Sequence, residues 1–213
     1  MEQGCVDVFR RHPELAALAA DFERAVEMLL ETSQAGGTIM ACGNGGSASD
    51  AEHIVGELMK GFLLPRPVPT EFRRALVENY GQEMGDGLAN RLQCGIRAVS
   101  LTGHPALTTA YANDMAPDMI FAQQVFGLGK PGDVLIGLST SGNSPNVVQA
   151  FQVARAMGIW RIAFTGETGG KLLGLSDICL RAPARPAYLV QEMHLPLYHA
   201  LCARVEEALY GTA

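Results

Sequence analysis

The sequence predicts an α/β protein with a mainly parallel β-sheet flanked by helices. Short apolar runs rich in β-branched residues alternate with stretches of helical periodicity, which is the order expected of βαβ crossovers. The predicted strands are 38–42, 98–101, 134–138, 161–164 and 178–180. The main predicted helices are an N-terminal helix at about 13–32 and further helices at 47–59, 146–157 and 188–209.

Each element follows from its own local pattern. In the first helix, apolar residues recur at helical spacing, and the pair Gly36-Gly37 ends it. The buried strand 38–42 leads into a helix with Ala and Val on one side. The remaining strands are short apolar runs with helical stretches between them, and the chain closes with a long helix.

The stretch 65–97 fits this alternation less well. It contains PRPVP, a charged amphipathic segment and a cluster of three glycines, where an α/β unit normally has a short connection. We expect a helical insertion here, with one or two extra helices over the sheet edge or at a subunit contact.

Length and composition predict a single globular domain over 1–213. The chain is 48% hydrophobic and 18% charged, which is enough apolar material for a sizeable core and shows no sign of disorder. A net charge of −6 and the absence of Lys/Arg runs argue against nucleic acid as the main partner. An anionic small substrate remains compatible, because backbone amides bind anions without a basic surface.

The cysteines and the N-terminal sequence indicate a cytoplasmic setting. Five scattered cysteines without a CxxC pair are typical of reduced thiols, not of a disulfide framework or a cysteine zinc site. No apolar signal core and no run of membrane-spanning length occur, so we expect no membrane partner.

Two glycine- and serine-rich turns follow predicted strands. The first, GNGGSAS at 43–49, joins a strand to a helix and combines sharp-turning glycines with a helix N-terminus, which together favour an anion site. The alternative is a plain βα turn in which Ser47 merely caps the helix.

The second turn, STSGNS at 139–144, places four hydroxyls in six residues, more than capping requires. We therefore expect phosphate to bind there, at the carboxyl end of parallel strands.

Two pairs of polar residues are candidates for metal binding and proton transfer. His53 and Glu57 are four residues apart and share one helix face. In QEMHLPLYH, Gln191 and His199 fall on the same general side of the last helix. Together they make a plausible divalent metal site. The alternatives are a solvated surface pair and a choice of His194 over His199, with the unused histidine bonded to a backbone carbonyl in the core.

These motifs together resemble one known family. GNGGSAxDAxH, the triplet Ala112-Asn113-Asp114, STSGNSPNV, TGETGGK at 165–171 and QEMHLPLYH are similar to the sedoheptulose-7-phosphate isomerases, or phosphoheptose isomerases, which have the sugar-isomerase (SIS) domain fold. The resemblance covers about 16–207 apart from 65–97. It implies a three-layer sandwich with a five-stranded parallel sheet, assembled as a homotetramer with active sites at subunit interfaces.

The resemblance also implies roles for individual residues. Zinc would be held by His53, Glu57, Gln191 and His199. The substrate and its phosphate would contact Asn44, Gly45, Gly46, Ser47, Asp114, Ser139, Thr140, Ser141, Ser144 and Gln191. Glu57 and His199 would be catalytic.

Two positions depart from the family pattern. Gly61 stands where relatives usually have an arginine, with Lys60 adjacent, and Tyr188 stands where they usually have an aspartate. Both positions contact the sugar chain in the family. Phosphate binding and the isomerisation chemistry therefore follow from the resemblance more directly than the identity of the sugar does.

The expected activity is the aldose–ketose isomerisation of a phosphosugar through a cis-enediol or enediolate. Glu57 would remove a proton from carbon, His199 would move one at oxygen, and a metal would polarise the carbonyl. The expected reaction converts sedoheptulose 7-phosphate to D-glycero-D-manno-heptose 7-phosphate. The alternatives are an isomerase of another phosphosugar and a non-enzymatic tetrameric SIS scaffold that binds the replication initiator.

Overall fold

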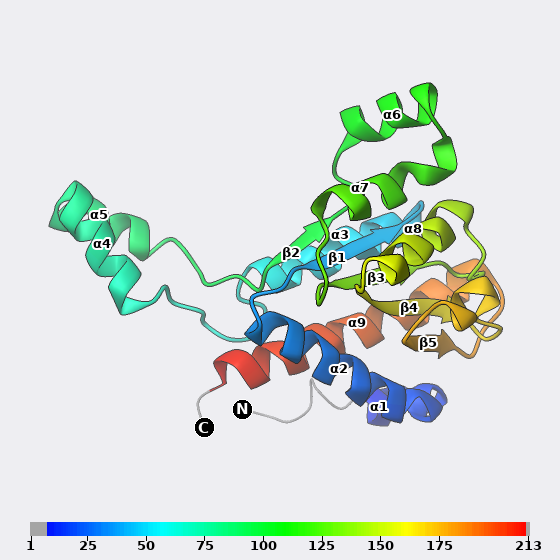
Figure 1. The fold of residues 1–213 in the computed structure, drawn as a ribbon. Helices are drawn as coiled ribbons and strands as arrows, with labels where there is room; N and C mark the ends of the chain where they lie inside the picture. Colours follow the sequence, from blue (N-terminus) through cyan, green and yellow to red (C-terminus); the bar gives the residue numbers. More distant parts are fainter. Residues whose placement is uncertain (1–7, 212–213) are drawn as a thin grey trace.

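The computed structural model describes residues 8–211, so the predicted thiol of Cys5 lies outside the described residues. Its centre is a five-stranded sheet in the order β2-β1-β3-β4-β5, with every neighbouring pair parallel (Figure 1). The strands are β1 (Ile39–Gly43), β2 (Ala98–Ser100), β3 (Val134–Leu138), β4 (Trp160–Gly166) and β5 (Ile178–Ala182). The predicted fold class and all five predicted strands are confirmed.

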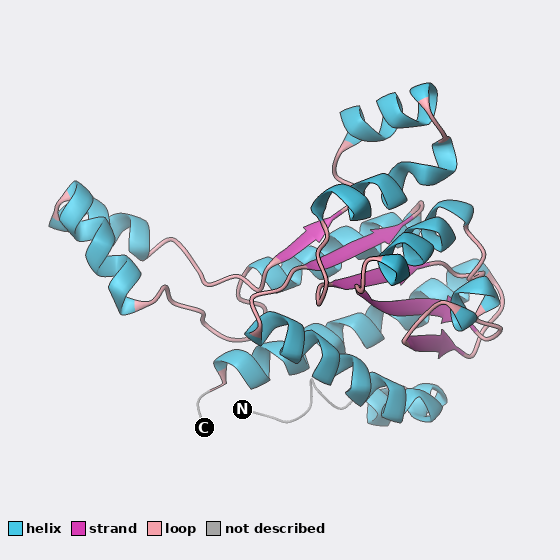
Figure 2. Ribbon diagram, in the orientation of Figure 1, coloured by secondary structure: helices cyan, strands magenta, loops and turns pink. Residues whose placement is uncertain are grey.

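Helices cover both faces of the sheet (Figure 2). The α-helices are α1 (Val8–Arg11), α2 (Ala19–Gln34), α3 (Gly46–Met59), α4 (Thr70–Tyr80), α5 (Gln82–Ala89), α6 (Pro105–Asp114), α7 (Ile120–Leu128), α8 (Pro145–Ala156) and α9 (Ala187–Tyr210). Short 3₁₀-helices are η2 (Pro13–Leu18), η3 (Pro117–Met119) and η4 (Gly170–Gly174). The predicted N-terminal helix is therefore α-helical only from Ala19, because its first six residues form η2.

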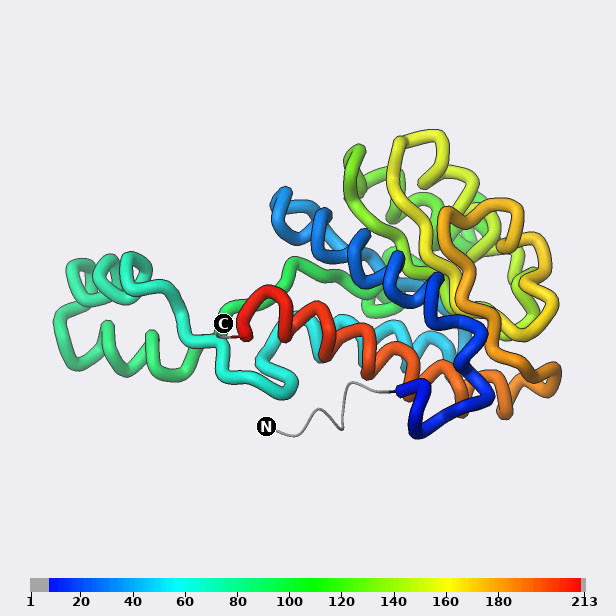
Figure 3. Tube along the Cα trace, turned by 90° about the horizontal axis from the view of Figure 1, so that it is seen from below, coloured from blue at the N-terminus to red at the C-terminus, as the bar shows by residue number. Residues whose placement is uncertain are grey.

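Alternate residues of the strands point to two separate cores. Ile39 and Ala41 pack with apolar side chains of α2, α3 and α9, whereas Met40 and Cys42 pack with those of α7 and α8. This alternation is the two-residue period of a β-strand buried on both sides. Figure 3 shows α2 and α9 side by side on the first of these faces.

The neighbouring strands β1 and β3 send their following helices to opposite faces of the sheet. The helix α3 after β1 lies on the first face, and α8 after β3 lies on the second. In α/β sheets of this kind, the crevice at such a switch point is the usual position for a ligand. The last residues of the two strands, Gly43 and Leu138, are paired in the sheet, so the turns that follow begin at the same level.

The predicted insertion at 65–97 contains two helices, but they do not lie over the sheet edge. The helices α4 and α5 pack on each other and project away from the sheet as a hairpin (Figure 1). No residue of α4 is buried, and only Gly85 and Ala89 are buried in α5. The prediction of extra helices is confirmed. Of the two expected places, the sheet edge is wrong, and a subunit contact stays a prediction. In the part of the chain that the structure describes, none of the helices combines the length and the apolar character of a membrane span.

Candidate active site

The first glycine turn makes a tight connection from β1 to α3. Gly45 precedes the helix with φ of +56°, a conformation that side chains other than glycine's rarely adopt. Gly46 packs against the carboxamide of Gln191, whose Nε2 atom would lie 2.6 Å from a Cβ added at this position. Ser47 is buried within the first turn of α3 and makes no side-chain capping bond. The alternative of Ser47 as a simple helix cap is therefore wrong.

Reciprocal hydrogen bonds join the two predicted turns. Asn44 Nδ2 donates to Asn146 Oδ1 at 2.9 Å, and Asn146 Nδ2 donates to Asn44 Oδ1 at 2.8 Å. Asn146 lies in the first turn of α8, directly after the second turn. The two turns therefore form one continuous rim at the switch point between β1 and β3.

The serine-rich second turn uses its hydroxyls in two ways. Ser139 is buried, and its hydroxyl lies 2.9 Å from that of Ser144, so this pair stabilises the turn itself. Thr140 and Ser141 line a hollow that also contains Asn143 and the guanidinium-bearing Arg185. Glu167 lines the same hollow and accepts a hydrogen bond from Arg185 Nε, so the hydroxyls are the groups left to bind a phosphate and the arginine is already paired.

The turn closes on Gly142, whose φ is +66°. A Cβ at Gly142 would lie 2.0 Å from the carbonyl oxygen of Gly169, so the backbone there is packed too closely for any side chain. This contact holds the hydroxyl-bearing segment against the loop after β4.

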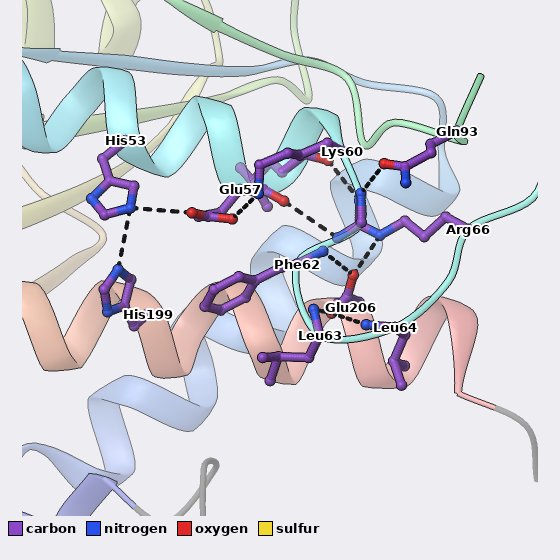
Figure 4. A network of polar contacts seen from close by, with 12 residues as sticks. His53, Glu57, Lys60, Phe62, Leu63, Leu64, Arg66, Gln93, His199 and Glu206 are labelled. Atoms are coloured by element: carbon purple, nitrogen blue, oxygen red, sulfur yellow. Dashed lines mark hydrogen bonds and ion pairs between the residues drawn. The ribbon is translucent and has the colours of Figure 1, made fainter. Parts of the chain in front are cut away.

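Three of the predicted metal and catalytic residues meet between α3 and α9 (Figure 4). His53 Nε2 lies 3.1 Å from Glu57 Oε1 and 3.4 Å from His199 Nε2. The Glu57 side chain is 11% exposed and that of His53 is 42% exposed. Burial, followed by the neighbouring His53, lowers the pKa of His199, which favours the neutral imidazole with a free lone pair. The i,i+4 pair is thus part of a three-residue cluster and not a solitary surface contact.

Further polar groups contact His53 and Glu57 on the sides that face away from the centre of the cluster. The hydroxyl of the buried Tyr198 lies 3.0 Å from His53 Nδ1 and donates to Asp50 Oδ1 at 3.3 Å. Lys60 Nζ lies 2.6 Å from the second oxygen of Glu57, Oε2. Each oxygen of Glu57 therefore has a different neighbour.

The loop after α3 is anchored by a buried ion pair. Arg66 Nε donates to Glu206 Oε1 at 2.7 Å, and neither side chain is exposed. Glu206 also accepts the backbone amides of Phe62, Leu63 and Leu64 at 2.6–3.1 Å. Burial alone raises the pKa of Glu206, but these amides and Arg66 outweigh it, so its pKa lies below the usual value.

The two histidines of QEMHLPLYH have different environments. His194 is completely buried, and its Nε2 lies 3.2 Å from the backbone carbonyl of Thr165. Burial lowers the pKa of His194 to about 4. It is thus the core histidine bonded to a backbone carbonyl, and His199 is the one that joins the cluster.

Gln191 and Asp114 do not contact the cluster within one chain. Gln191 lies against the start of α3, two helical turns before His199 along α9. Asp114 is exposed at the end of α6, where it accepts a bond from Asn113 at 2.9 Å. Their roles as a zinc ligand and as a substrate contact stay predictions.

The cluster fits zinc by the nature of its atoms and by two of its distances. Zinc–nitrogen bonds of about 2.0–2.1 Å place two ligands of a tetrahedral site about 3.3 Å apart, close to the two contacts of His53. His53 stands between the other two, however. Within 8–211, no three His, Cys, Asp or Glu side chains are placed so that all could hold one metal ion. Closing the set would require Glu57 and His199 to turn toward one another.

The two departures from the family pattern have local explanations. A Cβ at Gly61 would lie 2.7 Å from the carbonyl oxygen of Leu64, so the loop around Glu206 leaves no room for an arginine there. Lys60 takes the position beside Glu57 instead. Tyr188 is 63% exposed in the first turn of α9, where it is accessible to a sugar or to a neighbouring chain.

The comparisons with known proteins agree with this geometry. The model of the SIS domain family matches residues 9–73 and 74–166. The chain is therefore an SIS-domain protein. It is 36% identical over 208 residues to a phosphoheptose isomerase of Akkermansia muciniphila, covering 98% of this chain and 94% of that protein. A phosphoheptose isomerase of Thiobacillus denitrificans is 39% identical over 198 residues, with 92% and 87% covered.

A solved structure shows the same relationship. Phosphoheptose isomerase GmhA from Neisseria gonorrhoeae superposes with a TM-score of 0.74 at 33% identity, with 94% of each chain covered. The chain belongs to the phosphoheptose isomerase family. The predictions of this family and of an enzyme of the phosphosugar isomerase class are thereby confirmed, in preference to a non-enzymatic scaffold.

Sequence reasoning missed several members of the site. Asn146, Tyr198 and Lys60 each contact a predicted site residue, and Asp50 accepts a hydrogen bond from Tyr198. Asp50 lies three residues before His53, and Lys60 lies three residues after Glu57. This spacing would have placed each of them on the same side of α3 as its neighbour. Asn146 carried no such signal, because its partner is 102 residues away.

Proposed function

We propose that this enzyme isomerises sedoheptulose 7-phosphate to D-glycero-D-manno-heptose 7-phosphate through an enediol or enediolate. The observation that carries the proposal is the meeting of Glu57, His53 and His199 on two neighbouring helices, one of which begins at the paired turns. The names of the relatives support the heptose as substrate. Gly61 and Tyr188 make the choice of sugar the part most in need of a test.

In this mechanism, the turn at 139–144 binds the phosphate and Asn44 and Ser47 orient the sugar near it. Binding energy from the phosphate, remote from the reacting carbons, positions the open-chain sugar for proton transfer. Glu57 takes the proton from the carbon next to the carbonyl, and His199 moves a proton between the two oxygens. The proton that leaves one carbon is returned to its neighbour, so the reaction needs no external oxidant or reductant.

Zinc is the metal in this proposal, held by His53, Glu57, Gln191 and His199. When bound, it would polarise the carbonyl and stabilise the charge that develops on oxygen. Glu57 would act as both ligand and base here, and its oxygen Oε2 would have to leave its ion pair with Lys60 to take a proton. Oε1 faces His53 on the side of the proposed metal, and Oε2 faces Lys60.

Assembly as a homotetramer in the cytoplasm, with active sites at subunit interfaces, belongs to the same proposal. The position of Asp114 supports it. This predicted substrate contact lies at the exposed end of α6, a helix that projects from the sheet (Figure 1). In the proposed tetramer, its carboxylate would contact the substrate bound by a neighbouring chain.

The test is an isomerase assay over ketose phosphates of five to seven carbons, with Glu57→Gln beside the wild type. We expect turnover of sedoheptulose 7-phosphate by the wild type and a loss of at least about 100-fold in kcat for Glu57→Gln. Calorimetry should show that this variant still binds the phosphosugar. Glu78→Gln, on the exposed face of α4, is the matched control and should keep full activity.

Two results would change the proposal. Turnover of a different phosphosugar only would keep the mechanism and replace the substrate. Undiminished turnover by Glu57→Gln would remove Glu57 from the role of base.

A further inference from the structure

A row of polar side chains lies behind His53, on the side away from Glu57. Tyr198, only 1% exposed, places its hydroxyl 3.0 Å from His53 Nδ1 and 3.3 Å from Asp50 Oδ1. Asp50 and His53 are three residues apart on α3, whereas Tyr198 is on α9 next to His199. The row thus connects the two helices that carry the cluster.

The chemistry of Asp50 gives the row a direction. An ionised carboxylate only accepts hydrogen bonds, so the Tyr198 proton points to Asp50 and the phenol oxygen is left to accept one. His53 can supply that bond only with a hydrogen on Nδ1. If Tyr198 donated to His53 instead, Oδ1 of Asp50 would lose its donor. The other oxygen of Asp50, Oδ2, is already buried without a partner in the described part of the chain, so the carboxylate would then have neither bond. An unsatisfied buried carboxylate is costly, which favours the first arrangement.

The phenol is suited to this part. A phenol hydroxyl can donate one hydrogen bond and accept another, which matches the two partners that Tyr198 has here. Tyr198 is also held by its surroundings, because its ring contacts the rings of His53 and His199 edge-on at centroid distances of 5.5 and 4.9 Å. The hydroxyl therefore stays aligned between its two partners.

The consequence for His53 concerns its other nitrogen. With the hydrogen of Nδ1 engaged by Tyr198, Nε2 is the atom that faces Glu57 Oε1 and His199 Nε2. The Glu57 carboxylate also only accepts hydrogen bonds, so Nε2 carries a hydrogen for it until a metal takes the place of that hydrogen. A metal-bound histidine commonly donates its second ring N–H to such an outer partner, which fixes the ring and its tautomer.

We propose that Tyr198 and Asp50 are positioning residues that keep a hydrogen on His53 Nδ1 and so present Nε2 as a ligand for a divalent metal. This inference rests on the zinc site of the proposed function and assigns that site an outer pair of residues. Neither residue touches the substrate in this role. They act through His53.

The experiment measures Zn²⁺ affinity by competition with a chromophoric chelator for the full-length wild type, Tyr198→Phe and Asp50→Ala. Loss of an outer partner typically weakens metal binding about 10–100-fold, and we expect this for each variant. Tyr210→Phe is the matched control, because Tyr210 is on the same helix and packs under Arg66 instead. It should bind Zn²⁺ like the wild type. Far-UV circular dichroism shows whether each variant is folded at the temperature of the titration.

The double variant Tyr198→Phe/Asp50→Ala separates positioning from a general structural role. If the two residues act in one row, the second change should add less than about threefold to the first, because the row is already broken. Independent structural damage would instead multiply the two effects. Should one single variant fail to fold, the other still reports on the row.

The outcomes distinguish this inference from the function on which it rests. Zn²⁺ binding by Tyr198→Phe and Asp50→Ala at wild-type affinity overturns the inference and leaves the zinc site intact. Multiplied effects in the double variant also overturn it. A wild type that binds no Zn²⁺ but isomerises phosphosugars overturns the zinc site and this inference together, while the isomerase function stands.

Discussion

At the scale of single residues, the two histidines of QEMHLPLYH show what a sequence leaves open. They are five residues apart on one helix, and the spacing of either histidine from Gln191 is compatible with a shared site. Their difference arises only when α9 packs on the sheet. One side of the helix then brings His194 against Thr165 and Phe164, and another brings His199 to α3.

The burial of His194 predicts a pH dependence of stability. Its folded pKa is about 4 and its ordinary value is 6.5, so between these values the unfolded chain binds more protons than the folded one. Stability is therefore present above pH 6.5 and is lost as the pH falls toward 4. From this group we expect a loss of about 2 kcal/mol between pH 7 and pH 4.5.

Urea unfolding at the two pH values checks this for the wild type and His194→Gln, in which the side chain keeps a donor for Thr165. The variant should lose less stability than the wild type over the same interval. Equal losses would show that other groups dominate the acid sensitivity.

The turn glycines were the most predictable residues of the site. Gly45 and Gly142 both have positive φ, as their positions between a strand and a helix suggested. The pairing of Asn44 with Asn146 was not predictable in the same way. It depends on β1 and β3 being neighbours, and that is a property of the strand order.

At the scale of elements, the buried strands were predictable and the finer helix boundaries were not. The strands β1 and β3 are buried at every position, so their sequences are continuous apolar runs. The segment 13–18 reads as α-helix from its apolar spacing but forms η2. Its buried residues Leu15 and Leu18 are three apart, the spacing that a 3₁₀-helix aligns on one side.

The loop after α3 is the element that sequence reasoning placed least well, because Arg66 appeared to belong to the insertion. It is instead a buried partner of Glu206, and it also donates to the carbonyl of Leu58 at 2.7 Å. Replacing it by methionine would leave Glu206 buried without a cation. We expect Arg66→Met to lower the free energy of unfolding by about 3–5 kcal/mol.

Chemical denaturation of Arg66→Met and of Arg74→Met compares a buried with an exposed arginine. Arg74 is exposed on α4, and its replacement should change stability by less than about 0.5 kcal/mol. A loss below 1 kcal/mol for Arg66→Met would mean that the three backbone amides satisfy Glu206 by themselves.

At the scale of the whole molecule, the hairpin of α4 and α5 stands apart from the sheet and its two cores. Its base is closed by the bridge between Pro67 and Gln93 and by the bond from the Cys94 amide to the Arg66 carbonyl at 2.7 Å. The chain therefore leaves and re-enters the body at one point. The sequence predicted the presence of extra helices, but their direction depends on contacts beyond the local pattern.

This arrangement predicts that the hairpin is dispensable for folding. Replacing residues 69–91 by a short Gly/Ser linker should leave the thermal unfolding midpoint within about 4 °C of the wild type, a change of less than about 1 kcal/mol. Light scattering should give an unchanged number of chains per particle. A large drop in the midpoint would show that the hairpin stabilises the fold or its assembly.

The position of the cluster between α3 and α9 has a consequence for synthesis of the protein. His53 and Glu57 leave the ribosome early, but Tyr198 and His199 follow 145 and 146 residues after His53, on the last helix of the described chain. An unfinished chain that already contains both glycine turns still lacks His199, one of the two proposed acid–base groups. Prematurely terminated products would also lack the α9 side chains that complete the first core, such as Leu197 and Leu201, so only a chain translated through α9 gains both the complete fold and the proposed chemistry.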